Sequence, residues 1–172
     1  MAKKATRRGH KSTTKTPANI VNRRASFDYQ LDDDLIVGLE LTGAETKAAR
    51  LGHIQLRGSY VVPKRNQSNG KTELFLINAS FSLANNIAKA YGQPSTTVDT
   101  RARKILAKRR QIDQLIEKKN TGYTIVPTKM LTTGRYVKLI IALGKGKKRY
   151  DKRETIKRRE ADREAGRQVK RM

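Results

Sequence analysis

The sequence has no cysteine, only two histidines and no long apolar run. Without cysteine, a disulfide framework and a thiolate metal site are both excluded. Because no stretch of about 18 apolar residues occurs, we expect no membrane span and no membrane partner. The basic N-terminal segment 1–8 has no apolar run behind it, so it does not look like a secretory signal. These features favour an intracellular chain, and we expect it in the cytoplasm.

The residues that could carry catalysis are equally sparse. His10 lies in a basic segment and His53 at the start of a predicted strand, and no nucleophile or metalloprotease motif surrounds either. The run Asp32–Asp34 could suit a hard cation, but adjacent residues of an extended chain point to alternate faces, which favours a solvated acidic turn. Gly144–Lys148 lacks the spacing and the hydroxyl residue of a phosphate loop. We therefore expect no enzyme, no metal and no cofactor.

Basic residues dominate what is present. The chain holds 39 Lys and Arg against 15 Asp and Glu, a net charge of +24, which makes polyanions the default partner. Residues 1–24 contain eight basic and no acidic groups, and residues 145–172 contain thirteen basic and five acidic groups. The stretch between them has a much lower charge per residue. Both ends are therefore expected to be cationic arms on a folded middle.

The length suits one domain with appendages. We expect a disordered basic arm over 1–18, an RNA-binding domain over 19–143 and a basic tail over 144–172. Apolar alternation in the domain predicts about six short strands. They are expected within 18–31, 35–41, 53–62 (kinked at Gly58), 72–81, 123–131 and 137–143. The predicted fold class is mainly β: a small antiparallel oligonucleotide-binding-type barrel with two or three inserted helices.

Capping signals place the inserted helices. Thr42 with Glu45 three residues later predicts a capping box for a helix over 43–51, and Gly52 ends it. A second helix is possible over 83–90, and the longest is expected over 101–120.

The predicted 101–120 helix carries six cations between residues 101 and 110. A solvated face is the simple interpretation, but the overall charge favours contact with phosphate groups. In the tail, apolar residues are too few and too small for a packed face, while Glu–Arg and Glu–Lys pairs support a helix. We expect this tail to be mostly disordered when free and helical against RNA phosphates. Tyr150 could stack on a base or pack on the barrel rim.

Several motifs resemble the small protein B family, which binds transfer-messenger RNA (SsrA RNA) in bacterial trans-translation. The matching residues are Asn22-Arg23-Arg24-Ala25 with Asp28-Tyr29; Leu41-Thr42-Gly43 with Glu45, Lys47, Arg50 and Gly52; Ser59-Tyr60-Val61; Leu76-Ile77-Asn78-Ala79; Arg101 with Arg103-Lys104; Gly122 with Thr124-Ile125-Val126-Pro127; and Gly146-Lys147-Lys148 with Tyr150-Asp151-Lys152-Arg153 and Lys157. They run through most of the chain from about Asn19.

The resemblance implies a factor that holds the tRNA-like domain of transfer-messenger RNA and enters the A site of a stalled ribosome. Elongation factor Tu would be an indirect partner, through the aminoacylated RNA, and the chain would act as a monomer. The residues and the resemblance together assign RNA binding to Asn22, Arg23, Arg24, Lys47, Arg50, Arg101, Arg103, Lys104 and Lys108. The resemblance assigns the decoding centre and the empty mRNA channel to Lys145, Lys147, Lys148, Tyr150, Asp151, Lys152, Arg153, Lys157 and Arg158.

Four positions depart from the family pattern. Phe27 occupies a position where the family commonly has His, and Ile36 one where an acidic residue is usual. Gln55 occupies a usual Asn position, and Lys108 a His or Asn position. Details of the RNA contact could therefore differ in this chain. A ribosomal or ribosome-assembly protein that binds rRNA is the alternative, and an RNA-modifying enzyme would need a catalytic group that the sequence does not offer.

Overall fold

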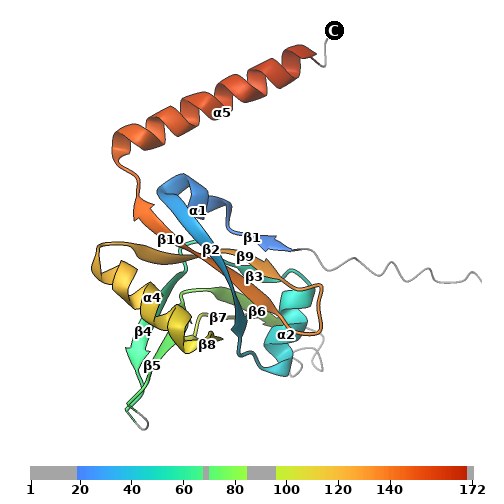
Figure 1. Cartoon of the computed structure of the whole chain (residues 1–172). Helices are drawn as coiled ribbons and strands as arrows, with labels where there is room; N and C mark the ends of the chain where they lie inside the picture. The colour runs from blue at the N-terminus through green and yellow to red at the C-terminus, as the bar shows by residue number, and fades with distance from the viewer. Residues whose placement is uncertain (1–18, 68–69, 85–95, 170–172) are drawn as a thin grey trace, which may run out of the picture.

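The computed structural model describes residues 19–67, 70–84 and 96–169 (Figure 1). The predicted N-terminal arm with His10, and most of the possible helix over 83–90, lie outside these residues. The elements are β1 Ile20–Val21, α1 Arg23–Asp28, β2 Tyr29–Leu39, α2 Gly43–Arg50, β3 Ile54–Gln55, β4 Tyr60–Arg65, β5 Thr72–Ile77, β6 Ser80–Ala84, β7 Thr96–Asp99, β8 Arg103–Leu106, α4 Arg109–Asn120, β9 Thr124–Leu131, β10 Lys138–Gly146 and α5 Arg149–Val169.

Seven strands form the main sheet in the order β1-β9-β10-β2-β8-β5-β4, and β3-β6-β7 form a smaller sheet. All of these pairings are antiparallel. β4 also meets β9, through the single pair Val61 and Ile125, so the strand order returns towards its beginning without forming a clean barrel. The described chain is thus mainly β with several helices.

The core lies inside this curved sheet. Leu74 and Leu76 on β5, and Leu139 and Ile141 on β10, are fully buried, because alternate residues of a strand point to the same face. Ile112 and Leu115 of α4 join the same apolar cluster. Burial of one such side chain contributes about 1.5–3 kcal/mol, so this face fixes the register of each strand. No described helix is long and apolar enough to cross a membrane.

The predicted helix over 101–120 is wrong in its first third. Residues Arg103–Leu106 form strand β8, which pairs with β5 and with β2, and the helix begins at Arg109. Arg103 and Ile105 point inward while Lys104 and Leu106 do not, which is the two-residue period of a strand. Pairing with two neighbouring strands overrides the helix propensity of this Arg-, Lys- and Ala-rich segment.

The segment before Leu35 also differs from the prediction. Residues 23–28 form helix α1, and the acidic run Asp32–Asp34 lies inside strand β2 instead of ending it. The register against β10 shifts there, since Ala142 pairs with Asp34 and Leu143 with Asp32. Asp33 is the extra residue and has a φ of 26°, as expected at a β-bulge.

The predicted capping box is confirmed. Thr42 accepts a hydrogen bond from the backbone of Glu45, and the Glu45 carboxylate accepts one from the Thr42 backbone. The single strand predicted over 53–62 is instead two strands in different sheets, β3 and β4. The chain does break at Gly58, as predicted, where φ is 74°.

Strand β10 continues to Gly146, three residues beyond its predicted end, since Gly144, Lys145 and Gly146 pair with β2. The tail follows as one helix, α5, which projects from the body beside α1 (Figure 1). That the free tail is disordered stays a prediction.

Candidate nucleic-acid interface

The first group of predicted RNA-binding residues lies on α1. Arg23 and Arg24 are exposed on this helix, but Asn22 is buried. The Asn22 amide donates hydrogen bonds to the carbonyl oxygens of Leu56 (3.0 Å) and Pro127 (2.9 Å). Its side-chain oxygen accepts from the backbone of Ala25 and so caps α1. Asn22 therefore builds the site by holding α1 on the sheet, while the two arginines face the solvent.

The base of the tail lies against the same helix. The Lys147 backbone donates to the Asp28 carbonyl (2.9 Å), and its ammonium donates to the Ser26 carbonyl (3.0 Å). Lys152 of α5 forms an ion pair with Asp28 at 3.0 Å. Burial raises the pKa of Asp28, but hydrogen bonds from Lys152 and Arg24 lower it more, so the net shift is downward. α1 and the start of α5 thus form one continuous basic surface.

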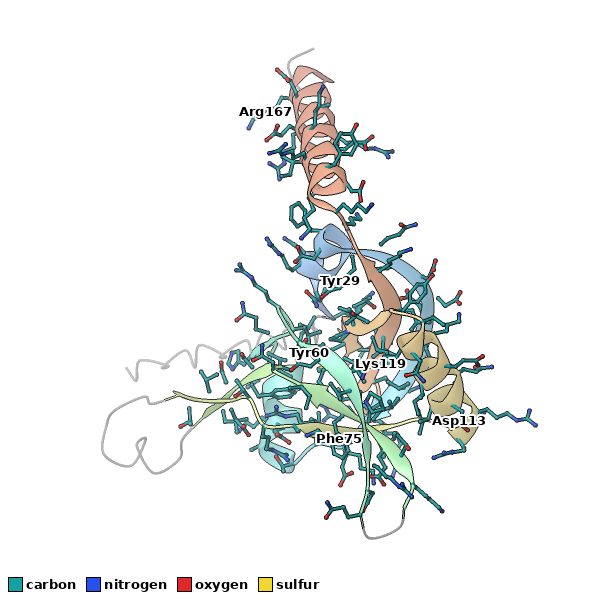
Figure 2. The ribbon with its side chains drawn as sticks, turned by 90° about the vertical axis from the view of Figure 1, so that its left-hand side faces the viewer. Tyr29, Tyr60, Phe75, Asp113, Lys119 and Arg167 are labelled. Atoms are coloured by element: carbon teal, nitrogen blue, oxygen red, sulfur yellow. The ribbon has the colours of Figure 1, made fainter. Side chains whose placement is uncertain are left out.

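The rest of the predicted tail set points outward. Tyr150 is 75% exposed, so it is available for stacking and does not pack on the rim of the sheet. Asp151 accepts a hydrogen bond from the Lys148 backbone at 3.0 Å and caps the first turn of α5. The other members are exposed along the sequence from β10 to the middle of α5: Lys145, Lys148, Arg153, Lys157 and Arg158. Figure 2 shows the side chains of α5 radiating from the helix up to Arg167, near its far end.

A second group surrounds a cleft of about 1000 Å³ between β2, β5, β8 and α4, which we call the β8–α4 cleft. Ile36 and Leu106 lie in it and are 56% and 52% exposed. Lys104 lines it and binds Glu73 at 2.7 Å, and this hydrogen bond raises the pKa of the lysine. Lys108 is exposed at the start of α4. The cleft combines apolar surface with a cationic rim, which suits a base or ribose next to phosphates.

The α2 residues Lys47 and Arg50 are exposed in the last turn of that helix. Arg50 donates to the Arg135 carbonyl (3.2 Å) in the connection between β9 and β10. The Arg135 guanidinium lies 5.4 Å from the ring centre of Tyr136. Tyr136 is 68% exposed and lines a smaller cleft with Ile36 and Leu106. This connection therefore extends the β8–α4 cleft towards α2.

The remaining predicted residues, Arg101 and Arg103, form a network around Glu45. The Glu45 carboxylate is buried and accepts from Arg101 (2.7 and 2.9 Å) and from Arg103 (2.8 Å). The Arg103 guanidinium lies 3.7 Å from the centre of the Phe81 ring. Burial raises the pKa of Glu45, but hydrogen bonds from the Thr42 backbone and from both arginines lower it further, to about 2.

The two arginines of this network differ in exposure, so they can have different roles. The Arg103 side chain has no exposed surface, so it cannot contact RNA where it lies. Arg101 remains 48% exposed and can present part of its guanidinium while bound to Glu45. The sequence alone cannot show this difference, because the residue type of an arginine in a basic segment does not reveal whether its side chain faces solvent or binds a buried carboxylate.

The four positions that depart from the family pattern lie in two places. Ile36 and Lys108 both line the β8–α4 cleft. Phe27 and Gln55 both line a second cleft, between α1 and the β3–β4 connection, with Arg57. Sequence reasoning missed Arg57 and Tyr136, since single basic or aromatic residues in connections carry no periodic signal.

No group of three His, Cys, Asp or Glu side chains that could hold a metal ion exists among the described residues. Asp33 of the acidic bulge instead pairs with Lys118 at 2.9 Å. His53 is exposed at the entrance to β3. The described surface therefore offers cations, aromatic rings and apolar patches. Fold and surface together define a mainly β protein built to contact a nucleic acid.

Comparison with known proteins identifies the family. The family model described as SmpB protein matches residues 19–171. An SsrA-binding protein of Enterococcus faecalis is 41% identical over 150 residues, covering 87% of this chain and 90% of that protein. One of Phocaeicola vulgatus is 39% identical over 158 residues, covering 91% and 98%. The chain belongs to the SmpB protein family.

A solved structure gives the same result. A chain of the structure described as "tmRNA-SmpB: a journey to the center of the bacterial ribosome" matches with a TM-score of 0.58 and 29% identity. The match covers 80% of this chain and 94% of that chain.

Proposed function

We propose that this chain is an RNA-binding factor that rescues stalled ribosomes by trans-translation. It binds the tRNA-like domain of transfer-messenger RNA and accompanies it into the ribosomal A site. Family membership supports this role, because the relatives are SsrA-binding proteins and the structural neighbour is a tmRNA–SmpB assembly of the bacterial ribosome. Elongation factor Tu takes part indirectly, through the aminoacylated RNA. The role is recognition and placement, with no catalytic step assigned to the chain.

The observation that carries the proposal is the separation of two cationic surfaces. One lies on the body, along the β8–α4 cleft, α2 and α1, and the other follows the projecting helix α5. A protein that contacts a single flat RNA needs one such surface. Two surfaces, one of them on a helix that extends beyond the body, fit a protein that holds one RNA while reaching into another.

We assign the tRNA-like domain to the body, residues 19–143. Its direct contacts are Arg23, Arg24, Lys47, Arg50, Arg101, Lys104 and Lys108. Asn22 and Arg103 support them from inside, through the α1 cap and the Glu45 network. We infer that the body is an oligonucleotide-binding-type barrel, since the strand order returns from β4 to β9.

We assign the decoding centre and the empty mRNA channel to the tail, residues 144–172. Its lysines and arginines supply phosphate contacts, and exposed Tyr150 supplies a stacking surface. Asp151 acts by capping α5. Beyond the ion pair between Lys152 and Asp28 at its first turn, α5 has too few large apolar residues for a packed face, which leaves most of its length available for a channel of rRNA.

The test compares the full chain with a version that ends at Lys148. This end point keeps β10, whose residues Gly144–Gly146 pair with β2, and keeps the Lys147 contacts to α1. A chain that ends at Val169 is the matched control, since it loses C-terminal residues but keeps α5. Each version is measured for affinity to transfer-messenger RNA and for tagging of a peptide on an mRNA without a stop codon.

We expect the Lys148 version to keep its RNA affinity within about threefold and to lose tagging, while the Val169 control keeps both. A collapse of RNA affinity in the Lys148 version alone would contradict the division into two surfaces. Full tagging by the Lys148 version would contradict the role assigned to the tail.

A further inference from the structure

The hairpin of β4 and β5 extends from the body on the side opposite to α5, as Figures 1 and 2 both show. Its strands pair with other strands only near the body, at Val61 of β4 and at residues 74–76 of β5. Farther out, β4 and β5 pair only with each other among the described residues. We call this outer part, residues 64–67 and 70–72, the β4–β5 ribbon. It is a two-stranded arm that stands out from the main sheet.

The β4–β5 ribbon is positively charged. Residues 57–72 contain four basic and no acidic groups. Lys64, Arg65 and Lys71 are exposed on the ribbon. Glu73 follows at its base and binds Lys104 at 2.7 Å, so this carboxylate is already engaged by a cation of the β8–α4 cleft. The ribbon therefore presents a surface that attracts anions.

The ribbon borders the β8–α4 cleft, in which the body is proposed to hold RNA. Lys71 and Thr72 line this cleft. The Arg109 guanidinium at the start of α4 donates to the Thr72 carbonyl at 3.4 Å and pairs with Asp113 at 3.1 Å. These contacts join the ribbon to α4, so an RNA backbone that leaves the cleft on this side passes the ribbon cations.

The ribbon side chains suit phosphates better than bases. Its described residues are polar or basic, and none is aromatic. Proteins that bind single strands stack bases on aromatic rings, whereas duplex RNA is recognised by its shape and through its phosphates. The Lys64 ammonium lies 5.9 Å from the centre of the Phe75 ring, and the Arg65 Nε donates to the Gly70 carbonyl at 3.3 Å. Both contacts restrict the cations before RNA arrives, which lowers the entropy cost of binding.

We propose that the β4–β5 ribbon is an RNA-binding arm that contacts the phosphates of a duplex stem, beside the segment held in the β8–α4 cleft. Lys64 and Arg65 are its principal contacts. The arm lengthens the RNA-binding surface of the body in the direction away from the tail. The inference rests on the proposed function in naming the tRNA-like domain as the source of this stem.

The first experiment measures RNA affinity of the full chain across a range of salt concentrations. The probes are a transcript of the tRNA-like domain and an unrelated RNA stem of about 16 base pairs. The variants are Arg65→Gln and the double change Lys64→Gln with Arg65→Gln. Lys118→Gln is the control for Arg65→Gln, because Lys118 is a half-exposed cation at the other end of α4, paired with Asp33.

We expect the double variant to bind the tRNA-like domain about tenfold more weakly, with a salt slope reduced by about 1 to 2, because two phosphate contacts are lost. Arg65→Gln should give part of this loss, and Lys118→Gln should leave affinity and slope unchanged. The thermal midpoint of the double variant should stay within about 2 °C of the native chain, since both residues are exposed. Native affinity and slope in the double variant would overturn the inference.

A second measurement locates the ribbon on the RNA while keeping all of its cations. The chain has no cysteine, so Gln67→Cys provides one attachment point for an iron chelate that cleaves nearby RNA with hydroxyl radicals. Gln114→Cys, exposed on α4 beside the acidic bulge, is the control. We expect the chelate at position 67 to cleave both strands of one stem of the tRNA-like domain, and the chelate at position 114 to leave that stem intact.

The possible failures are distinguishable. Cleavage from position 67 in single-stranded loops alone, or no cleavage, would overturn the duplex contact even if the double variant were misfolded. Equal affinity of the native chain for the unrelated stem and for the tRNA-like domain would count against the proposed function. The ribbon would then be judged on the unrelated stem, where the double variant should still show the weaker binding and the reduced salt slope.

Discussion

At the scale of single residues, the role of a basic side chain depends on its environment as well as on its residue type. The chain has 39 basic residues, yet the structure gives them different tasks. Arg103 is a core residue that neutralises Glu45 and stacks on Phe81, whereas Lys108 is free to face solvent at the start of α4. Burial of one carboxylate with two arginines is tolerated because each charge has hydrogen-bonding partners. Glu45 therefore holds α2, with Lys47 and Arg50, against the segment that precedes β8.

This arrangement predicts the acid stability of the protein. The pKa of Glu45 is about 2 in the folded chain and 4.5 for the free side chain. Its stabilising contribution is complete above pH 4.5 and is lost as the pH falls through 2, because the unfolded state takes up the proton first. Over this window the free energy of unfolding should fall by about 3 kcal/mol from this group. Urea unfolding at pH 5, 4, 3 and 2 measures it.

The matched variants are Glu45→Gln and Asp33→Asn. Glu45→Gln should lower stability at pH 7 by about 3 kcal/mol, since it leaves two arginines without their carboxylate, and should flatten the pH dependence. Asp33→Asn should keep the dependence of the native chain, because Asp33 is 78% exposed. An unchanged pH dependence in Glu45→Gln would show that another group controls acid unfolding.

At the scale of elements, tertiary pairing decides what local propensity leaves open. Residues 101–106 have the composition of a helix, yet Arg103–Leu106 form a strand, because β2 and β5 each offer an edge. The opposite happens at 23–28, where a short helix forms in a segment that reads as a strand, because Asn22 caps it and Ala25 packs inside. Elements whose signals are local, such as α2 with its capping box, could be predicted from the sequence.

The end of β10 gives the second prediction, about glycine. A Cβ on Gly144 would lie 2.9 Å from the Cβ of Tyr29, which packs over this position, whereas a Cβ on Gly146 would meet nothing within 4 Å. Gly144→Ala should therefore cost about 1–3 kcal/mol, because Tyr29 and strand β2 must shift. Chemical denaturation measures this, with Gly146→Ala as the control at the same strand end. Equal stability of the two variants would mean that Tyr29 moves away without cost.

At the scale of the whole molecule, the chain divides into a packed body and a helix that the body hardly covers. Figure 1 shows α5 leaving the body at the end of β10, and Figure 2 shows the side chains drawn along this helix up to Arg167. Stability that comes from a core cannot extend to such a helix, because helices draw most of their stability from a packed face. Residues such as Lys157 and Arg158 are therefore free to follow whichever phosphates the tail meets.

Amide hydrogen exchange tests this division. In the free protein, the backbone amides of α5 should exchange many times faster than those of β10, since they open without disturbing the core. Binding to stalled ribosomes should slow exchange in α5 and leave β10 nearly unchanged. Strong protection of α5 before any RNA is added would contradict the expectation that this helix depends on RNA.

The sequence by itself determined which kind of partner and which family we expect for this protein. Its charge and its lack of cysteine and catalytic motifs indicated a nucleic-acid partner, and the spacing of motifs from Asn22 to Lys157 indicated the family. Such signals are local, since they depend on residue type and on spacing along the chain. The capping box of α2 and the break in the chain at Gly58 are also local signals.

Only the tertiary structure decided which residues face outward and which meet. It buried Asn22 and Arg103, exposed Ile36 and Leu106 in one cleft with Lys108, and brought Lys152 to Asp28. These outcomes depend on pairs far apart in sequence, such as Glu45 with Arg103 or Asp28 with Lys152. Their contacts form only when strand pairing and core burial have fixed the whole chain. No short stretch of sequence contains both partners of such a contact, so local patterns cannot predict it.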